Sequence, residues 1–122
     1  MPTRRLIFTG LIASAVLLPL TATAQARKDA PAREIAGSYS ADGMNADGSR
    51  YAGAVEITQT GKTIQVAWSI AGDTYAGTGT LEGRVLTVDW GSATPVIYVV
   101  MDDGELHGTW GDGSALEKLT PR

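Results

Sequence analysis

The stretch from Tyr51 to Trp90 alternates apolar and polar residues and is divided by turns that contain glycine. A repeat of two residues places every second side chain on the same face of an extended strand. The alternation is clearest in 63–70, where large apolar residues stand at the even positions without a slip. Two segments, 51–68 and 75–90, each consist of an alternating run, a turn and a second alternating run. We therefore predict two successive β-hairpins here.

The same pattern continues over the rest of the chain from Glu34 onward and predicts about eight short strands. No segment after the N-terminal region has the spacing of apolar residues that is typical of a helix. One connection, 41–49, is predicted to be long, and the run 96–101 is predicted to be covered on both faces because both are apolar. The strands are predicted at 35–40, 51–58, 63–70, 75–81, 86–90, 96–101, 106–110 and 115–119.

Strands joined by short turns in sequence order form an antiparallel up-and-down meander. A meander of about eight strands has to cover its apolar face and its two edge strands, and closure into a barrel does both. We therefore predict an all-β fold with a small eight-stranded barrel, and a two-layer β-sandwich is the alternative.

The N-terminal region has the features of a secretory signal peptide. Two arginines, Arg4 and Arg5, precede an apolar run at 6–20, and small residues follow it. This run is shorter than the roughly 20 residues that span a bilayer, which disfavours an uncleaved anchor. We predict a signal peptide at 1–26, a lead-in at 27–33 and one β domain at 34–120. The protein is then exported to the periplasm or the extracellular space.

The charge and the cysteine content restrict the partners. Without Arg4 and Arg5, eight basic residues stand against thirteen acidic ones, a net charge of −5. An acidic chain without a basic cluster is poorly suited to bind nucleic acid or, after signal cleavage, an anionic membrane. The chain has no cysteine, so its stability depends on the sheet and the core rather than on disulfides.

The sequence lacks the residues of the common catalytic sites. His107 is the only histidine and no Gly-x-Ser-x-Gly motif is present, which disfavours a serine hydrolase. We expect His107 to be an exposed strand residue. Asp89, Asp102 and Asp103 could supply paired carboxylates, but acids near turns are usually solvated. We predict that the protein is not an enzyme.

No cofactor or metal is predicted either. A zinc or iron site needs several histidine or cysteine ligands. The segment 42–49 resembles a calcium-binding loop in part, but the EF-hand pattern would place Gly43 and Ala54 at ligand positions. We predict a polar loop with Asx turns in this segment.

Aromatic residues and glycines share the faces that are predicted to point inward. Large rings can fill a small barrel by lying over the bare backbone of glycines in neighbouring strands. The alternative is an aromatic pocket for a small apolar or planar ligand at one mouth of the barrel. The residues predicted to bind such a ligand are Tyr51, Tyr75, Trp90 and Trp110.

Turn and core residues over nearly the whole mature chain resemble a group of small exported bacterial proteins, some of which carry a fibronectin-binding label. The resemblance lies in Gly37-x-Tyr39, Gly43-x-Asn45-x-Asp47-Gly48-Ser49-x-Tyr51-x-Gly53, Trp68-x-Ile70, Tyr75-x-Gly77-x-Gly79 and Asp103-Gly104-x-Leu106-x-Gly108-x-Trp110. A more distant similarity to avidin and lipocalin barrels concerns the fold. The resemblance implies a binding or structural module for a host or matrix protein, and a carrier of a small apolar ligand is the alternative.

Overall fold

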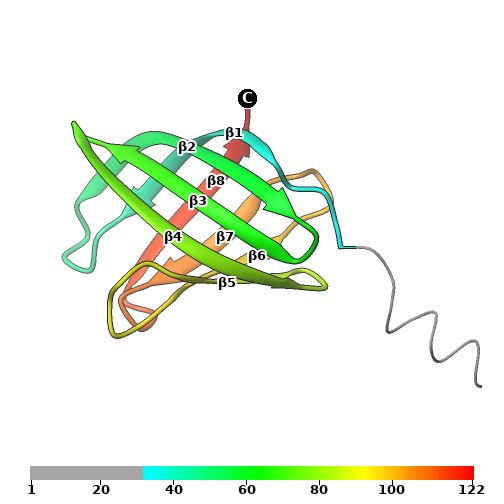
Figure 1. Cartoon of the computed structure of the whole chain (residues 1–122). Coiled ribbons are helices and arrows are strands. Elements are labelled where there is room, and N and C mark those ends of the chain that lie inside the picture. The colour runs from blue at the N-terminus through cyan, green and yellow to red at the C-terminus, as the bar shows by residue number, and fades with distance from the viewer. Residues whose placement is uncertain (1–31) are drawn as a thin grey trace, which may run out of the picture. The chain divides into compact units, whose positions relative to one another are not determined.

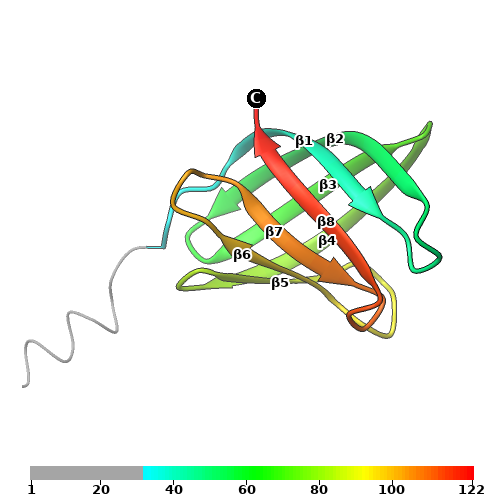
Figure 2. The same cartoon turned by 180° about the vertical axis from the view of Figure 1, so that it is seen from behind.

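Eight antiparallel strands close into a barrel in which each strand pairs with its neighbours in sequence and β8 pairs with β1 (Figures 1 and 2). The computed structural model describes residues 32–122, so the predicted signal peptide and residues 27–31 of the lead-in lie outside the described residues. In this part of the chain, no helix is long and apolar enough to cross a membrane. The strands are β1 (Gly37–Met44), β2 (Arg50–Thr60), β3 (Thr63–Ile70), β4 (Asp73–Glu82), β5 (Val85–Asp89), β6 (Val96–Val100), β7 (Leu106–Trp110) and β8 (Ala115–Pro121).

The predicted meander and its closure into an eight-stranded barrel are confirmed, and the alternative of a two-layer sandwich is wrong. Two-residue connections join β2 to β3, β3 to β4 and β4 to β5. The β3–β4 turn consists of Ala71 and Gly72, both with positive φ (53° and 84°), as in the type I′ turns that match the twist of a hairpin. Such tight turns leave no chain for a crossover between two sheets.

The core lies inside the barrel, and every second residue of β5 and β6 and of most of β3 is buried there. Several large rings lie over glycines, as predicted for the barrel interior. A Cβ atom on Gly108 would lie 2.4 Å from Tyr98 Cδ1, so the Tyr98 ring occupies the space that a side chain on β7 would need. The buried apolar residues include Ile57, Ile64, Val66, Trp68, Leu81, Leu86, Val88, Tyr98, Leu106 and Leu119.

The structure corrects the extent of the predicted first strand and the predicted cover of residues 96–101. Residues 41–44 belong to β1 rather than to a long loop, and the β1–β2 connection is 45–49. Ala41 is buried there, although it is too small to give a clear apolar signal. The β6 strand is not covered on both faces, since Ile97 and Val99 are exposed on its outer side. A single closed sheet has only one interior, so the apolar residues on its outer face meet solvent.

The N-terminal segment 32–36 closes one end of the barrel. Ile35 lies in the core instead of in the predicted first strand, and Tyr39 Oη donates a hydrogen bond of 2.6 Å to its carbonyl oxygen. The Ile35 amide donates to Gln59 Oε1 at 2.8 Å, and Gln59 Nε2 donates to the Arg33 carbonyl at 2.6 Å. This segment lies at the end that carries the β2–β3, β4–β5 and β6–β7 connections (Figure 1). The other four connections surround the opposite end.

Candidate functional site: an aromatic mouth with a buried carboxylate

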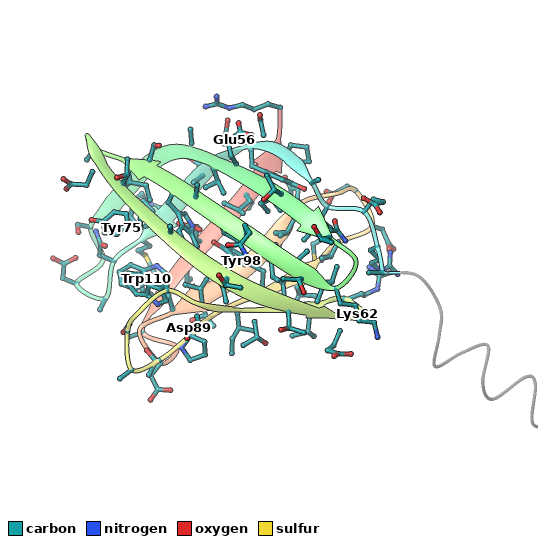
Figure 3. The ribbon with its side chains drawn as sticks, viewed as in Figure 1. Glu56, Lys62, Tyr75, Asp89, Tyr98 and Trp110 are labelled. Carbon is teal, nitrogen blue, oxygen red and sulfur yellow. The ribbon has the colours of Figure 1, made fainter. Side chains whose placement is uncertain are left out.

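A cavity of about 440 Å³ opens at the end of the barrel opposite Ile35. It lies among the residues that flank the β1–β2, β3–β4, β5–β6 and β7–β8 connections. In Figure 3, the labelled Tyr75 and Trp110 are at this end, and Lys62 is at the other. We call this opening the mouth, and its lining residues are Asn45, Tyr51, Trp68, Ile70, Ala71, Asp73, Tyr75, Trp90, Val96, Trp110 and Glu117.

Four aromatic rings form a continuous series along the wall of the mouth. The ring centroids of Tyr75 and Trp90 are 6.3 Å apart, those of Trp90 and Trp110 are 6.0 Å apart, and those of Trp110 and Tyr51 are 6.4 Å apart. All three pairs have the edge-to-face geometry that aromatic rings favour. The indole nitrogen of Trp90 donates to the Thr94 carbonyl at 3.1 Å, which holds this ring toward its own loop. The structure thus brings the four residues predicted to bind a ligand into one cavity, and ligand binding itself stays a prediction.

The floor of the mouth contains Glu117, a residue that sequence reasoning missed. Its exposed fraction is only 5%. Glu117 Oε2 accepts a hydrogen bond from Tyr98 Oη and one of 3.1 Å from Trp68 Nε1. Glu117 Oε1 accepts one of 2.8 Å from Tyr51 Oη. Both carboxylate oxygens therefore have partners within the protein.

The direction of these hydrogen bonds follows from the chemistry of the donors. An indole N–H can only donate, so the Tyr51 oxygen accepts the 3.0 Å hydrogen bond from Trp110 Nε1. The single hydroxyl proton of Tyr51 is then free to point to Glu117. The Trp68 indole proton is shared between Tyr98 Oη at 3.0 Å and Glu117 Oε2 at 3.1 Å, and the Tyr98 proton points to Glu117. All three neighbours donate to Glu117, which is the arrangement that suits an ionised carboxylate.

Both tyrosines remain protonated donors at neutral pH. Burial raises the pKa of Tyr98 well above its ordinary value, and the negative charge of Glu117 raises it further. The pKa of Tyr51 is raised by the same two causes in the same order. The two phenols therefore stay neutral and donate hydrogen bonds to the Glu117 carboxylate.

Two glycines make room for this arrangement. In the sheet, Glu117 is paired with Gly43 of β1 on one side and with Gly108 of β7 on the other. The next strands place Tyr51 opposite Gly43 and Tyr98 opposite Gly108. Each tyrosine therefore leans over a glycine to reach the carboxylate. A Cβ atom on Gly43 would lie 1.9 Å from Tyr51 Cζ. Only glycine at position 43 therefore gives the Tyr51 ring the space that it occupies.

The carboxylate is held by neutral donors and not by a cation. The ion pairs among residues 32–122 join Lys62 with Glu82, Arg84 with Asp102, and His107 with Glu105. None of them includes Glu117, and no lysine, arginine or histidine belongs to the described lining of the mouth. Within residues 32–122, the mouth therefore combines aromatic rings with two carboxylates, Asp73 and Glu117, and with no basic side chain in its lining.

His107, Asp89, Asp102 and Asp103 are not among the residues that line the mouth. His107 is an exposed strand residue, as predicted, with Nε2 at 2.9 Å from Glu105 Oε1. Asp89, Asp102 and Asp103 are exposed near turns, as expected. In the β1–β2 connection, the predicted Asx turn is formed by Asp47 Oδ1, which accepts a 2.9 Å hydrogen bond from the Ser49 amide.

A sequence signal for Glu117 did exist. Ala115, Glu117 and Leu119 share one phase of the alternation in β8, and the first and last are fully buried. An acidic residue at an inward position is unusual and indicates a role for its charge. Leu116 is a large apolar residue in the opposite phase, so the sequence alone does not show which phase of β8 points inward.

A scan against protein-family models finds no match to the chain, and a search of curated proteins finds none either.

Proposed function

We propose that the protein binds a small molecule with an apolar or planar body in the mouth of its barrel. The observation that carries this proposal is the cavity of about 440 Å³ and its wall of four aromatic rings. Ligand sites typically have volumes of about 300–1,000 Å³ and are lined mainly by apolar and aromatic side chains with a few polar groups. The volume and lining of the mouth agree with this description.

The position of the rings supports binding more than core filling. Trp68 and Tyr98 are buried and fill the barrel below the mouth. Tyr75, in contrast, is 43% exposed, and Trp90 and Trp110 are only partly buried. Covering these rings with a ligand would remove apolar surface from water, which is favourable by about 25 cal/mol per Å². Because Ile35 and its neighbours close the other end, the ligand would enter and leave through the mouth.

We propose binding without catalysis. The lining contains two carboxylates, Asp73 and Glu117, but no described serine, cysteine or histidine. A serine or cysteine nucleophile with a histidine base therefore has no candidate in this described lining. The predicted signal peptide supports a role for this binding in the periplasm or outside the cell.

The test is to incubate the purified protein with a small-molecule extract of bacterial culture, wash it, and identify retained compounds by mass spectrometry. We expect one compound or a small group to be retained by the wild type and lost from Trp90→Ala. Val99→Ala is the matched control, because Val99 is an exposed apolar residue on the outer face. Equal retention by the two variants, or retention of nothing by the wild type, would contradict the proposal.

A second candidate function is attachment to a matrix protein through the outer face of β5, β6 and β8. Val85 and Val99 are paired across two strands and are 42% and 41% exposed. Ile97 and Leu116 are also exposed on this face, and exposed apolar patches often mark protein interfaces. Immobilised fibronectin is the probe that the sequence resemblance suggests.

Surface plasmon resonance over this fibronectin should show binding that Val99→Lys abolishes. Ala67→Lys adds the same charge on the exposed face of β3 and should leave the binding unchanged. Absence of binding by the wild type, or equal effects of the two substitutions, would contradict this second function.

A further inference from the structure

Glu117 is a buried carboxylate that has no cationic partner among residues 32–122. Burying an ionised carboxylate is costly unless it is both hydrogen-bonded and electrically compensated. Tyr51, Tyr98 and Trp68 supply three hydrogen bonds, but these donors carry no net positive charge. No basic side chain of residues 32–122 forms an ion pair with Glu117. A bound cation would supply the missing charge.

The acceptor capacity of Glu117 also leaves room for a ligand. A carboxylate has about four lone-pair positions for hydrogen bonds. Oε2 accepts two hydrogen bonds and Oε1 accepts one, so Oε1 can accept another. Glu117 belongs to the lining of the cavity, so a donor in the cavity can approach it.

The rings above Glu117 are of the kind that recognises cations. The face of a tryptophan or tyrosine ring attracts an ammonium group within about 6 Å of its centroid, and aromatic cages bind organic cations in this way. Tyr51, Tyr75, Trp90 and Trp110 surround the same cavity. Asp73 adds a second carboxylate to its lining. Rings and carboxylates together favour a positive ligand and disfavour a negative one.

We infer that the ligand is an organic cation: a protonated amine whose N–H group donates to Glu117 Oε1 and whose apolar body lies among the four rings. This inference rests on the proposed small-molecule binding and adds the chemical class of the ligand. It separates two roles within the mouth. The rings hold the body of the ligand, and Glu117 selects its charge.

The experiment compares molecules that share a body and differ in one group. The probes are 2-phenylethylamine, 2-phenylethanol and 3-phenylpropanoate, and the corresponding indole series is tryptamine, tryptophol and indole-3-propanoate. The three tryptophans of the chain provide the signals, because each gives one indole N–H resonance in a proton–nitrogen correlation spectrum. Each probe is titrated into the labelled protein at neutral pH.

We expect the amines to shift the resonances of Trp90 and Trp110 and to bind at least about 10-fold more tightly than the alcohols, since a charged hydrogen bond is stronger than a neutral one. The carboxylates should leave these resonances in place. In Glu117→Gln, which keeps the shape but not the charge, amine affinity should fall at least about 30-fold, and alcohol affinity by less than about 3-fold. Glu82→Gln removes the same charge at an exposed position in β4 and serves as the control.

The possible results separate the inference from the proposed function. Equal affinity of amines and alcohols, or tighter binding of carboxylates, would overturn the cationic ligand and leave small-molecule binding in place. If no probe moves any indole resonance, both the inference and the proposed function are contradicted. The comparison in the wild-type protein is decisive even if Glu117→Gln fails to fold.

Discussion

Tyr51 Oη donates a 2.8 Å hydrogen bond to Glu117 Oε1 over Gly43, which is paired with both residues in the sheet. The two residues are 66 positions apart in the chain, and closure of the barrel between β1 and β8 brings them together. Tyr98 reaches the same carboxylate over Gly108 from the other side. The site thus depends on two glycines as much as on its polar residues.

Replacing Gly43 with alanine should displace the Tyr51 ring, because the new Cβ atom would lie 1.9 Å from Cζ in the present arrangement. The buried Glu117 would then lose one donor, at a cost of about 1–3 kcal/mol in the free energy of unfolding. Urea denaturation of Gly43→Ala and of the wild type measures this difference. An unchanged midpoint and slope would show that Tyr51 does not need the space above Gly43.

Removing the Tyr51 hydroxyl alone should also be destabilising. Tyr51→Phe removes one of the three donors to Glu117 and leaves Trp110 Nε1 without its acceptor, so we expect a loss of about 1–3 kcal/mol. Tyr75→Phe is the matched control in the same mouth, since Tyr75 is 43% exposed and its loss should fall within about 0.5 kcal/mol. Equal losses in thermal or urea melts would argue against the network around Glu117.

The aromatic wall of the site can be predicted from the sequence, because the up-and-down topology decides which strand ends meet. The starts of β2 and β4 and the ends of β5 and β7 lie at one end of an up-and-down barrel. Tyr51, Tyr75, Trp90 and Trp110 stand at or next to these positions, so the meander prediction was sufficient to bring them together. The residues of β3 were assigned to the correct faces because large apolar and polar side chains alternate there.

The rest depends on contacts that local patterns do not contain. Glu117 was missed because its partners come from three other strands and because Leu116 beside it is apolar. The sequence predicts a loop for the second half of β1, since Asp42 and Gly43 are typical of turns. Its strand pairing with β8 requires the barrel to close, which is a property of the whole chain.

The raised pKa of Tyr98 predicts a loss of stability at alkaline pH. An unfolded tyrosine ionises near pH 10, whereas buried Tyr98 keeps its proton to higher pH. Above about pH 10 the unfolded state therefore binds fewer protons than the native state, and the free energy of unfolding falls as pH rises. Tyr98→Phe should reduce this fall by about 0.7 kcal/mol per pH unit at pH 10, and by a slope that approaches about 1.4 kcal/mol per pH unit as the unfolded tyrosine becomes fully ionised. Urea melts from pH 8 to 11 measure the slope, and identical slopes for the variant and the wild type would contradict the role of Tyr98.

Export predicts a specific mature N-terminus. Small residues at Ala22, Ala24 and Ala26 fit cleavage after Ala24 or Ala26, so the mature chain should begin at Gln25 or Arg27. Intact-mass analysis of the protein from the periplasm or medium of a bacterial host gives the answer. Retention of residues 1–20 in a membrane fraction would contradict export by a cleaved signal peptide.

The central claim is that the mouth is open for a ligand while the barrel below it is filled, and two alanine variants test this directly. Trp68 is 4% exposed in the core, so Trp68→Ala should cost about 3–5 kcal/mol, from lost burial and the cavity left behind. Trp110 is only partly buried at the mouth, and Trp110→Ala should cost about 1–2 kcal/mol. Urea melts of both variants measure the two losses side by side. One large and one small loss is the predicted result, and equal, severe losses would show that Trp110 belongs to a filled core with no open site above it.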